Sequence, residues 1–205
     1  MKLNNKTLKK AFDHLSDDLC MRYLIDNFCN DIDIYERYES NYAKALSFLV
    51  IEQQVSFKAA ITIKNRFSKI INDLSDKDII DMDEKKIQKV GISFKKVEYI
   101  KNVYLYFKDS KFNFSDSSDQ DVINELTNIK GIGLWSAQMF LIFVLMRINI
   151  FSKGDLALMN SIKVNYSLDI NDSEKVDSLI KTWSPFKSVA SLLLWKSIEE
   201  RYYYS

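Results

Sequence analysis

The fold is decided by one stretch, residues 126–137, which reads LTNIKGIGLWSA. Apolar residues precede the glycines at helical spacing and predict a helix that ends at the turn; they are Val122, Ile123, Leu126 and Ile129. A second apolar run, residues 135–146, predicts another helix directly behind the turn. A Gly-Ile-Gly turn can adopt backbone angles that a side chain forbids, and it lets main-chain amides come very close to a ligand.

The amides that open the second helix are donors at the positive end of its dipole, where a phosphate binds. Two helices joined by a Gly-hydrophobe-Gly turn form the helix-hairpin-helix pattern, which grips a DNA backbone without reading bases. An ordinary pair of helices with a glycine turn is the alternative, and Gly131 and Gly133 alone favour that alternative. The whole segment from the turn through Asp155 argues against it.

The composition predicts a globular, all-helical protein. The chain has 205 residues, of which 47% are hydrophobic, enough for one large domain or two small lobes with a core. Four glycines and one proline are too few for a many-stranded protein. The net charge is only +1, but basic residues gather on single expected helices and allow one basic face, as with Lys58, Lys64, Arg66 and Lys69.

The cysteines and the apolar runs predict a cytoplasmic protein without a membrane partner. Cys20 and Cys29 are too few for an iron–sulfur cluster or a four-cysteine zinc site, and their apolar surroundings predict buried free thiols. The first residues lack the apolar core of a signal peptide. The longest apolar run, residues 137–146, is too short to cross a bilayer.

Helical periodicity recurs along the chain, and we find no internal repeat. Ser16, Ser56 and Ser93 are expected N-caps of the helices that follow them. The expected helices cover residues 8–15, 18–28, 42–52, 57–71, 75–81, 84–90, 94–107, 122–129, 135–146, 155–166, 173–182 and 186–203.

Several segments, in order from about residue 40 to Trp195, resemble helix-hairpin-helix DNA glycosylases of the 3-methyladenine type. The matching segments are residues 52–56 (EQQVS), 91–96 (GISFKK), 129–137 (IKGIGLWSA), 151–156 (FSKGDL) and 183–190 (WSPFKSVA) through Trp195. Each match alone is weak, but together they are specific. Lys130 and Ser152 stand where the family often has proline, and Ala157 stands where it often has glycine, which affects turn geometry and not the chemistry.

The resemblance implies a single compact, all-α domain over residues 1–205 with two lobes. One lobe is expected mainly at about 30–115, and the other comprises the N-terminus and about 116–205, with the active-site cleft between them. It implies a monomer that acts on damaged double-stranded DNA, in the cytoplasm with the chromosome, or in the nucleus of a eukaryote. No cofactor is required, but a Na⁺ or K⁺ ion is expected on hairpin carbonyls, at Thr127, Ile129 and Gly131.

The expected chemistry is hydrolysis of the bond between a damaged base and its deoxyribose. The nucleotide has to leave the duplex first, because its C1′ atom is hidden in the stack. An alkylated purine already carries positive charge and leaves easily, so the transition state resembles an oxocarbenium ion. A carboxylate beside C1′ stabilises that cation or orients the attacking water, and Asp155 is the candidate. The alternative role of Asp155 is a helix N-cap.

The remaining site residues follow from their place in the matched segments. Trp135, Met139 and Trp195 are expected to line the base pocket, because aromatic faces hold an electron-poor base; core packing is the alternative, equally weighted for Met139. Gln54 is expected to insert into the stack, with Val55 as a possible partner. The expected DNA-binding residues are Gln54, Val55, Ser56, Lys130, Gly131, Gly133 and Ser136.

Two other functions stay open at this point. A non-catalytic DNA-binding module would need the hairpin, but neither Asp155 nor the two pocket tryptophans, Trp135 and Trp195. A glycosylase for deaminated or oxidised bases would share the same machinery. Because Trp135 occupies the position where strand-cutting relatives carry a lysine, we expect a monofunctional enzyme that leaves the abasic strand intact.

Overall fold

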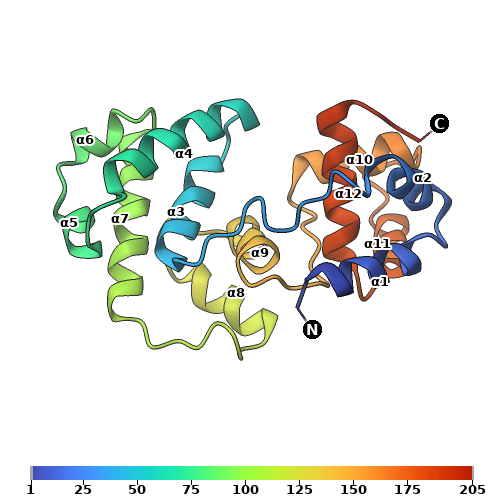
Figure 1. Ribbon diagram of the computed structural model, residues 1–205, viewed down its shortest axis with the longest axis horizontal. Coiled ribbons are helices and arrows are strands. Elements are labelled where there is room, and N and C mark those ends of the chain that lie inside the picture. Colours follow the sequence, from blue (N-terminus) through green and yellow to red (C-terminus); the bar gives the residue numbers. More distant parts are fainter. Residues whose placement is uncertain (1, 205) are drawn as a thin grey trace. The chain divides into compact units, whose positions relative to one another are not determined.

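The computed structural model describes residues 2–204, apart from the side chain of Phe57. Its regular elements within that range are α-helices and one isolated antiparallel bridge between Lys2 and Arg147, so the all-α prediction is confirmed. The helices, shown in Figure 1, are α1 (Asn5–Leu15), α2 (Leu19–Phe28), α3 (Tyr42–Glu52), α4 (Phe57–Ile71), α5 (Asp76–Asp81), α6 (Glu84–Gln88), α7 (Phe94–Asp109), α8 (Asp119–Thr127), α9 (Leu134–Phe143), α10 (Leu156–Asn165), α11 (Ser173–Thr182) and α12 (Lys187–Glu200).

The chain divides into two compact units. Unit 1 comprises the residues up to Tyr38 and those from Leu141 onward, and unit 2 comprises Glu39–Phe140. Compared with the expected lobe at about 30–115, unit 2 begins later and ends later, so it contains the Gly-Ile-Gly turn. It reaches Phe140 because the ring of Phe140 packs on Tyr42 at the start of α3 and on Phe114, with ring centroids 5.4 and 5.6 Å apart.

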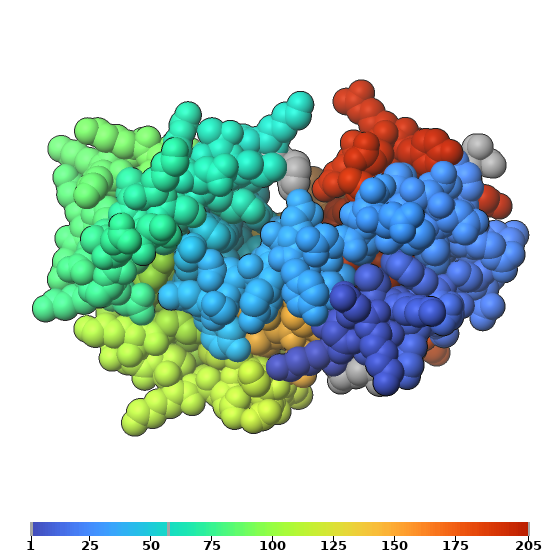
Figure 2. All heavy atoms as spheres, viewed as in Figure 1, coloured from blue at the N-terminus to red at the C-terminus, as the bar shows by residue number. Residues whose placement is uncertain are grey.

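Unit 1 is built around α12, which packs against α1, α2 and α10. The N-terminal helices and α12 adjoin although they come from opposite ends of the chain, as the blue and red atoms of Figure 2 show. The shared core is largely aliphatic and includes Leu24, Leu158 and Leu194, none of which is solvent-exposed. Both cysteines are free, as expected, but only Cys20 is buried, whereas Cys29 is half-exposed.

Unit 2 is built around the pair α3 and α7, with α5 and α6 against α7 (Figure 1). The apolar run of α3 is buried on nearly every side, as its composition predicts, and contains Leu46, Val50 and Ile51 with no solvent exposure. Burial of this helix fixes its carboxyl end, where the chain turns sharply into α4.

Capping side chains begin most of these helices. Ser56 caps α4 and Ser93 caps α7, as predicted. The prediction that Ser16 caps the second helix is wrong: Asp18 caps α2, accepting the Met21 N–H at 3.0 Å, and Ser16 instead ends α1. Asp accepts such a bond as well as Ser does, so Asp18 can take this role.

Helices α9 and α12 each end three residues before the predicted end, and a residue with left-handed backbone lies at or shortly after each end. Helix α9 ends at Phe143 and not at Met146, whose φ is 57°. Helix α12 ends at Glu200 and not at Tyr203, because Arg201 has φ 53°. Apolar side chains continue past both ends, which explains why periodicity overestimated the length.

Candidate active site

The Gly-Ile-Gly turn joins α8 to α9 and needs glycine at its first position only. Gly131 has φ 100°, in the left-handed region, and a Cβ built on it would lie 2.1 Å from Cγ of Tyr99 in α7. Backbone conformation and the Tyr99 ring therefore both exclude a side chain at Gly131. Gly133 has no left-handed backbone, and no heavy atom lies within 4 Å of its would-be Cβ. Glycine at position 133 is thus not required by the packing of the chain itself.

Helix α9 starts directly behind this turn. Its first helical hydrogen bond joins the Ala137 N–H to the Gly133 carbonyl at 3.1 Å, so the turn leads straight into the helix. First-turn amides of a helix have no acceptor within the helix and carry the positive end of its dipole. Leu134, in this first turn, is 55% exposed. Phosphate binding at this helix start stays a prediction.

The side chain of Gln53 connects the α3–α4 corner to the hairpin. Its Nε2 donates to the Gly131 carbonyl and to Ser136 Oγ, both at 3.0 Å. Lys96 Nζ in turn donates to the Ile51 carbonyl at 2.9 Å and the Gln53 carbonyl at 2.6 Å, and burial lowers the pKa of Lys96. Because the Ser136 side chain is buried and engaged by Gln53, the predicted DNA contact of Ser136 would use its main-chain amide.

The corner itself exposes the residues that were predicted to enter the DNA. Gln54 is exposed and has φ 55°, a left-handed conformation that non-glycine residues rarely adopt. Val55 is 37% exposed, and Ser56 Oγ accepts the Ala59 N–H at 3.4 Å as the cap of α4. The strained backbone at Gln54 presents its side chain away from the core of unit 2.

Lys130 pairs with an acidic residue in this structure. Its Nζ lies 2.5 Å from Oε1 of Glu98, and the pair raises the pKa of Lys130. Both side chains are exposed, so the pair contributes little to stability. A phosphate that binds Lys130 would have to compete with Glu98.

Asp155 is the N-cap of α10 in unit 1, and its side chain is nearly buried, with 9% of its surface exposed. Its Oδ1 accepts two hydrogen bonds: from the Leu158 N–H at 2.9 Å and from Trp195 Nε1 at 3.1 Å. The structure thus brings together Asp155 and Trp195, forty residues apart. Leu156, the next residue, is 81% exposed, so the buried carboxylate adjoins the surface.

Trp195 also stacks on Phe143, with ring centroids 5.5 Å apart and planes inclined by 28°. The guanidinium carbon of Arg37 lies 3.8 Å from the centroid of the same Phe143 ring. Sequence reasoning missed both Phe143 and Arg37. Phe143 lies in an apolar run, which predicts only a buried helix. Arg37 lies in an irregular segment whose sequence has no hydrophobic periodicity.

The other two predicted pocket residues lie in unit 2. Trp135 is half-buried, whereas Met139 is 1% exposed and part of the interior. Core packing, one of the two interpretations that the sequence left open, therefore describes the position of Met139 in this structure. A role for either residue in holding a base stays a prediction.

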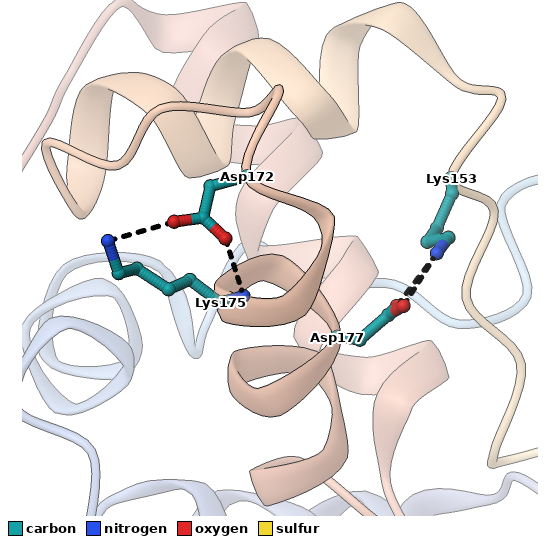
Figure 3. A network of polar contacts seen from close by, with 4 residues as sticks. All are labelled: Lys153, Asp172, Lys175 and Asp177. Atoms are coloured by element: carbon teal, nitrogen blue, oxygen red, sulfur yellow. Dashed lines mark hydrogen bonds and ion pairs between the residues drawn. The ribbon is translucent and has the colours of Figure 1, made fainter.

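The segment before Asp155 is fastened to α11 by a surface ion pair. Lys153 Nζ lies 2.8 and 3.0 Å from the two carboxylate oxygens of Asp177, and Figure 3 shows the two side chains pointing toward each other. In the same view Lys175 folds back onto Asp172, the N-cap of α11, at 2.8 Å. Both ion pairs are largely exposed, so each contributes little to the free energy of unfolding.

Two features are absent from the described residues: a cluster of metal-ligating side chains and a helix that could cross a membrane. No group of three or more His, Cys, Asp or Glu side chains within residues 2–204 is placed to hold a metal ion. Likewise, every described helix is too short or too polar to span a bilayer.

Two helices, α8 and α9, joined by a Gly-Ile-Gly turn define a helix-hairpin-helix protein. Residues 48–185 match the family described as HhH-GPD superfamily base excision DNA repair protein. The chain belongs to this family.

Relatives with assigned names are similar over most of this chain. A Bacillus subtilis relative is 31% identical over 162 residues, which are 73% of this chain and 56% of the relative. The DNA-3-methyladenine glycosylase of Saccharomyces cerevisiae is 31% identical over 196 residues, which are 76% of this chain and 66% of the relative. The chain thus spans less than two thirds of the length of these two relatives.

Among solved structures, the chain is similar to the 3-methyladenine DNA glycosylase Mag1 of Schizosaccharomyces pombe in complex with abasic DNA. The TM-score is 0.85 at 28% identity, and the match covers 96% of this chain and all of that chain. A 3-methyladenine DNA glycosylase from Archaeoglobus fulgidus has a TM-score of 0.77 at 18% identity, covering 93% of this chain and 69% of that chain. The latter likeness shows the fold alone.

Proposed function

We propose that this protein is a DNA glycosylase that releases alkylated purines of the 3-methyladenine type from duplex DNA. The observation that carries the proposal is the Asp155 carboxylate, nearly buried and held by two N–H donors on one oxygen, in a chain of the base excision repair family. The names of the yeast relatives and of the S. pombe structure support the same substrate class. A purely structural N-cap would need neither the indole donor nor burial.

The first step is capture of the backbone and extrusion of the damaged nucleotide. The turn at Gly131 and Gly133 offers its amides to phosphate without contacting bases, so binding should weaken as salt rises. Gln54 is exposed on a strained corner and would fill the gap that the extruded nucleotide leaves in the base stack. Extrusion itself costs a few kcal/mol, because the base has to be unstacked and unpaired. The Gln53 bond to the Gly131 carbonyl holds the corner at a fixed distance from the turn.

The second step is cleavage of the glycosidic bond. As the cationic base departs with the bonding electrons, positive charge develops on the sugar at C1′ and on its ring oxygen. The Asp155 carboxylate stabilises that charge or orients the attacking water, which adds to C1′ and gives up a proton. The Leu158 N–H and the Trp195 indole restrict the carboxylate to one orientation, so little reorganisation is needed during the reaction.

We propose that the enzyme is monofunctional and leaves an intact abasic strand. Enzymes that also cut the strand attack C1′ with an amine and form a Schiff base. Trp135 cannot form an imine, and Leu134 and Ser136 beside it carry no amine. Lys130, on the other side of the turn, is engaged by Glu98. Water is therefore the nucleophile.

A monovalent cation on the carbonyls of Thr127, Ile129 and Gly131 stays part of this proposal. The Ile129 carbonyl accepts the Ile132 N–H at 3.0 Å, and the Gly131 carbonyl accepts Gln53 Nε2. A carbonyl oxygen has two lone pairs, so each of these two retains an acceptor site and the residues fit such an ion. Na⁺ or K⁺ there would add positive charge beside the phosphate.

The proposal places the protein with the chromosome, in the cytoplasm, or in the nucleus of a eukaryote, acting as a monomer on damaged duplex DNA. The test is to incubate the protein with duplex DNA treated with a methylating agent and to identify the released bases by chromatography. Release of free 3-methyladenine, with the strand uncut until alkali is added, is the expected result. Salt-dependent DNA binding without any base release would instead favour a non-catalytic binding module.

A further inference from the structure

Lys96 holds the corner between α3 and α4 from a neighbouring helix. It lies in the first turn of α7, the helix that packs beside α3 (Figure 1), and its side chain is half-buried. Its Nζ donates to the Ile51 carbonyl at 2.9 Å and to the Gln53 carbonyl at 2.6 Å. Both carbonyls lie at the carboxyl end of α3, where the helix dipole is negative and favours a cation.

One of these two hydrogen bonds fixes the peptide that precedes Gln54. Gln53 has φ −55° and ψ 124°, and Gln54 has φ 55°. These angles resemble those of the two central residues of a type II turn, whose second residue needs positive φ and is usually glycine or asparagine. In a type I turn both central residues have negative φ, and the peptide between them is rotated by roughly half a turn. The Gln53 carbonyl belongs to that peptide, so its bond to Lys96 is made only in the strained conformation.

The strain at Gln54 needs a restraint from outside the corner. Glutamine gains nothing from positive φ, and the Gln54 side chain is exposed, so burial in the core does not hold it. The amide of Gln53 fixes the neighbouring side chain, by donating to the Gly131 carbonyl and to Ser136 Oγ. That contact leaves the peptide between Gln53 and Gln54 free to rotate, whereas the bond from Lys96 does not.

We propose that Lys96 is a positioning residue for base extrusion, because its ammonium holds the peptide before Gln54 in the orientation that presents this side chain to the DNA. The inference rests on the proposed glycosylase function and on the assignment of Gln54 as the inserting residue. Without the ammonium the peptide rotates, the positive φ of Gln54 is relieved, and the side chain points elsewhere. The phosphate-binding turn is retained, because Gln53 still holds the Gly131 carbonyl through its side chain.

The experiment measures binding to two duplexes of one sequence, one undamaged and one with a stable abasic-site analogue, by fluorescence anisotropy. An abasic site leaves a gap that an inserted side chain fills, so preference for the abasic duplex reports insertion. Affinity for the undamaged duplex reports the grip on phosphate. Neither measurement requires release of a base.

The variants separate the charge of Lys96 from its bulk. Lys96→Met keeps a long unbranched side chain without donors, and Lys96→Arg keeps the charge. Lys96→Gln is a second neutral variant, for use if Lys96→Met does not fold. Lys101→Met is the matched control: Lys101 lies on the same helix, is also half-buried, and donates to the carbonyl of Met82, which follows α5, at 2.7 Å.

We expect Lys96→Met to lower the preference for the abasic duplex about tenfold, equivalent to about 1.4 kcal/mol, and to leave affinity for the undamaged duplex within about threefold. Lys96→Arg should keep the preference within about threefold, and Lys101→Met within about twofold. Gln54→Gly should itself lower the preference. Adding Lys96→Met to Gln54→Gly should then change it by less than about twofold, because the side chain that Lys96 positions is gone.

Thermal unfolding tests the backbone part of the proposal. Gln54→Gly should leave the Tm of the wild type about unchanged, because relief of strain offsets the greater entropy of glycine in the unfolded chain. In the Lys96→Met background the same substitution should lower the Tm by about 1–4 °C, because no strain is left to relieve. An equal effect of Gln54→Gly in both backgrounds would show that Lys96 does not impose the positive φ.

Other results would also overturn the proposal. An equal loss of affinity for both duplexes in Lys96→Met would identify a phosphate contact or a merely structural lysine. An unchanged preference would show that Lys96 has no part in insertion, and a wild type without preference would show that there is no insertion to position. Failure of the wild type to release 3-methyladenine would refute the glycosylase function instead, and the binding ratios distinguish that failure because they need no chemistry.

Discussion

Replacement of Asp155 by asparagine separates the two roles of this residue. In the structure one oxygen, Oδ1, accepts both the Leu158 N–H of the cap and the Trp195 indole N–H. The side chain of the Asp155→Asn variant would retain an amide oxygen for these two donors and lose the negative charge. Asp155→Ala is the matched comparison, because it removes the charge and both hydrogen bonds.

The expected magnitudes differ sharply between stability and rate. Asn caps a helix about as well as Asp, so Asp155→Asn should change the free energy of unfolding by no more than roughly 0.5 kcal/mol. If the carboxylate supplies about 3–5 kcal/mol at the transition state, base release should fall by roughly 10²–10⁴-fold. Asp155→Ala loses a cap of about 1 kcal/mol and leaves the indole N–H of Trp195 without its acceptor for about 1–3 kcal/mol more.

Three measurements on the same preparations distinguish a catalytic role of Asp155 from a purely capping role. Single-turnover release of 3-methyladenine reports the chemical step, fluorescence anisotropy reports duplex affinity, and thermal unfolding reports stability. Asp155→Asn should bind DNA and unfold like the wild type while releasing base very slowly. Near-normal release by Asp155→Asn would show that position 155 acts only as a cap and that the catalytic assignment is mistaken.

Three further predictions concern the DNA-facing segments. Gly131→Ala should lower the free energy of unfolding by about 1–3 kcal/mol, because its Cβ meets Tyr99. Gly133→Val should change the free energy of unfolding by no more than about 1 kcal/mol, yet it should weaken binding to every duplex alike. Wild-type DNA affinity of the Gly133→Val variant would argue against a phosphate-binding turn. Borohydride should trap no covalent adduct on lesion DNA, because Trp135 offers no amine, and a robust adduct would contradict the monofunctional mechanism. Gln54→Gly removes the strain of a left-handed backbone, about 1–2 kcal/mol, so the variant should be about as stable as the wild type. Its excision of damaged bases from duplex DNA should nevertheless fall, and undiminished excision would exclude Gln54 as the inserting residue.

Local features of the sequence predicted most of the fold. Helical period and capping serines located α3, α4 and α7 correctly, and α3 and α4 to the residue, because burial and caps act over a few neighbouring positions. The ends of α9 and α12 were overestimated, since a left-handed residue such as Met146 or Arg201 has no mark in the apolar period. Asp18 caps α2 where Ser16 was predicted, and both residue types are strong N-caps.

The contacts of the candidate site were less accessible to sequence reasoning. The family resemblance predicted roles for Asp155 and Trp195 separately, but nothing in it joins the indole to the carboxylate. Gln53 was given no role from the sequence, yet its amide holds the hairpin through two hydrogen bonds, to residues more than seventy positions away. Such contacts arise only when helices distant in sequence pack together, as α10 and α12 do.

The cap and the proposed catalysis at Asp155 are not rival interpretations. A carboxylate that stabilises charge on a sugar has to be held still, and the helix start does so by a backbone N–H to Oδ1. The indole of Trp195 adds a second donor from another helix, so rotation about the side chain would break two hydrogen bonds. A helix N-terminus also favours negative charge at that place. The feature that sequence reasoning set against catalysis is therefore part of what prepares the group for it.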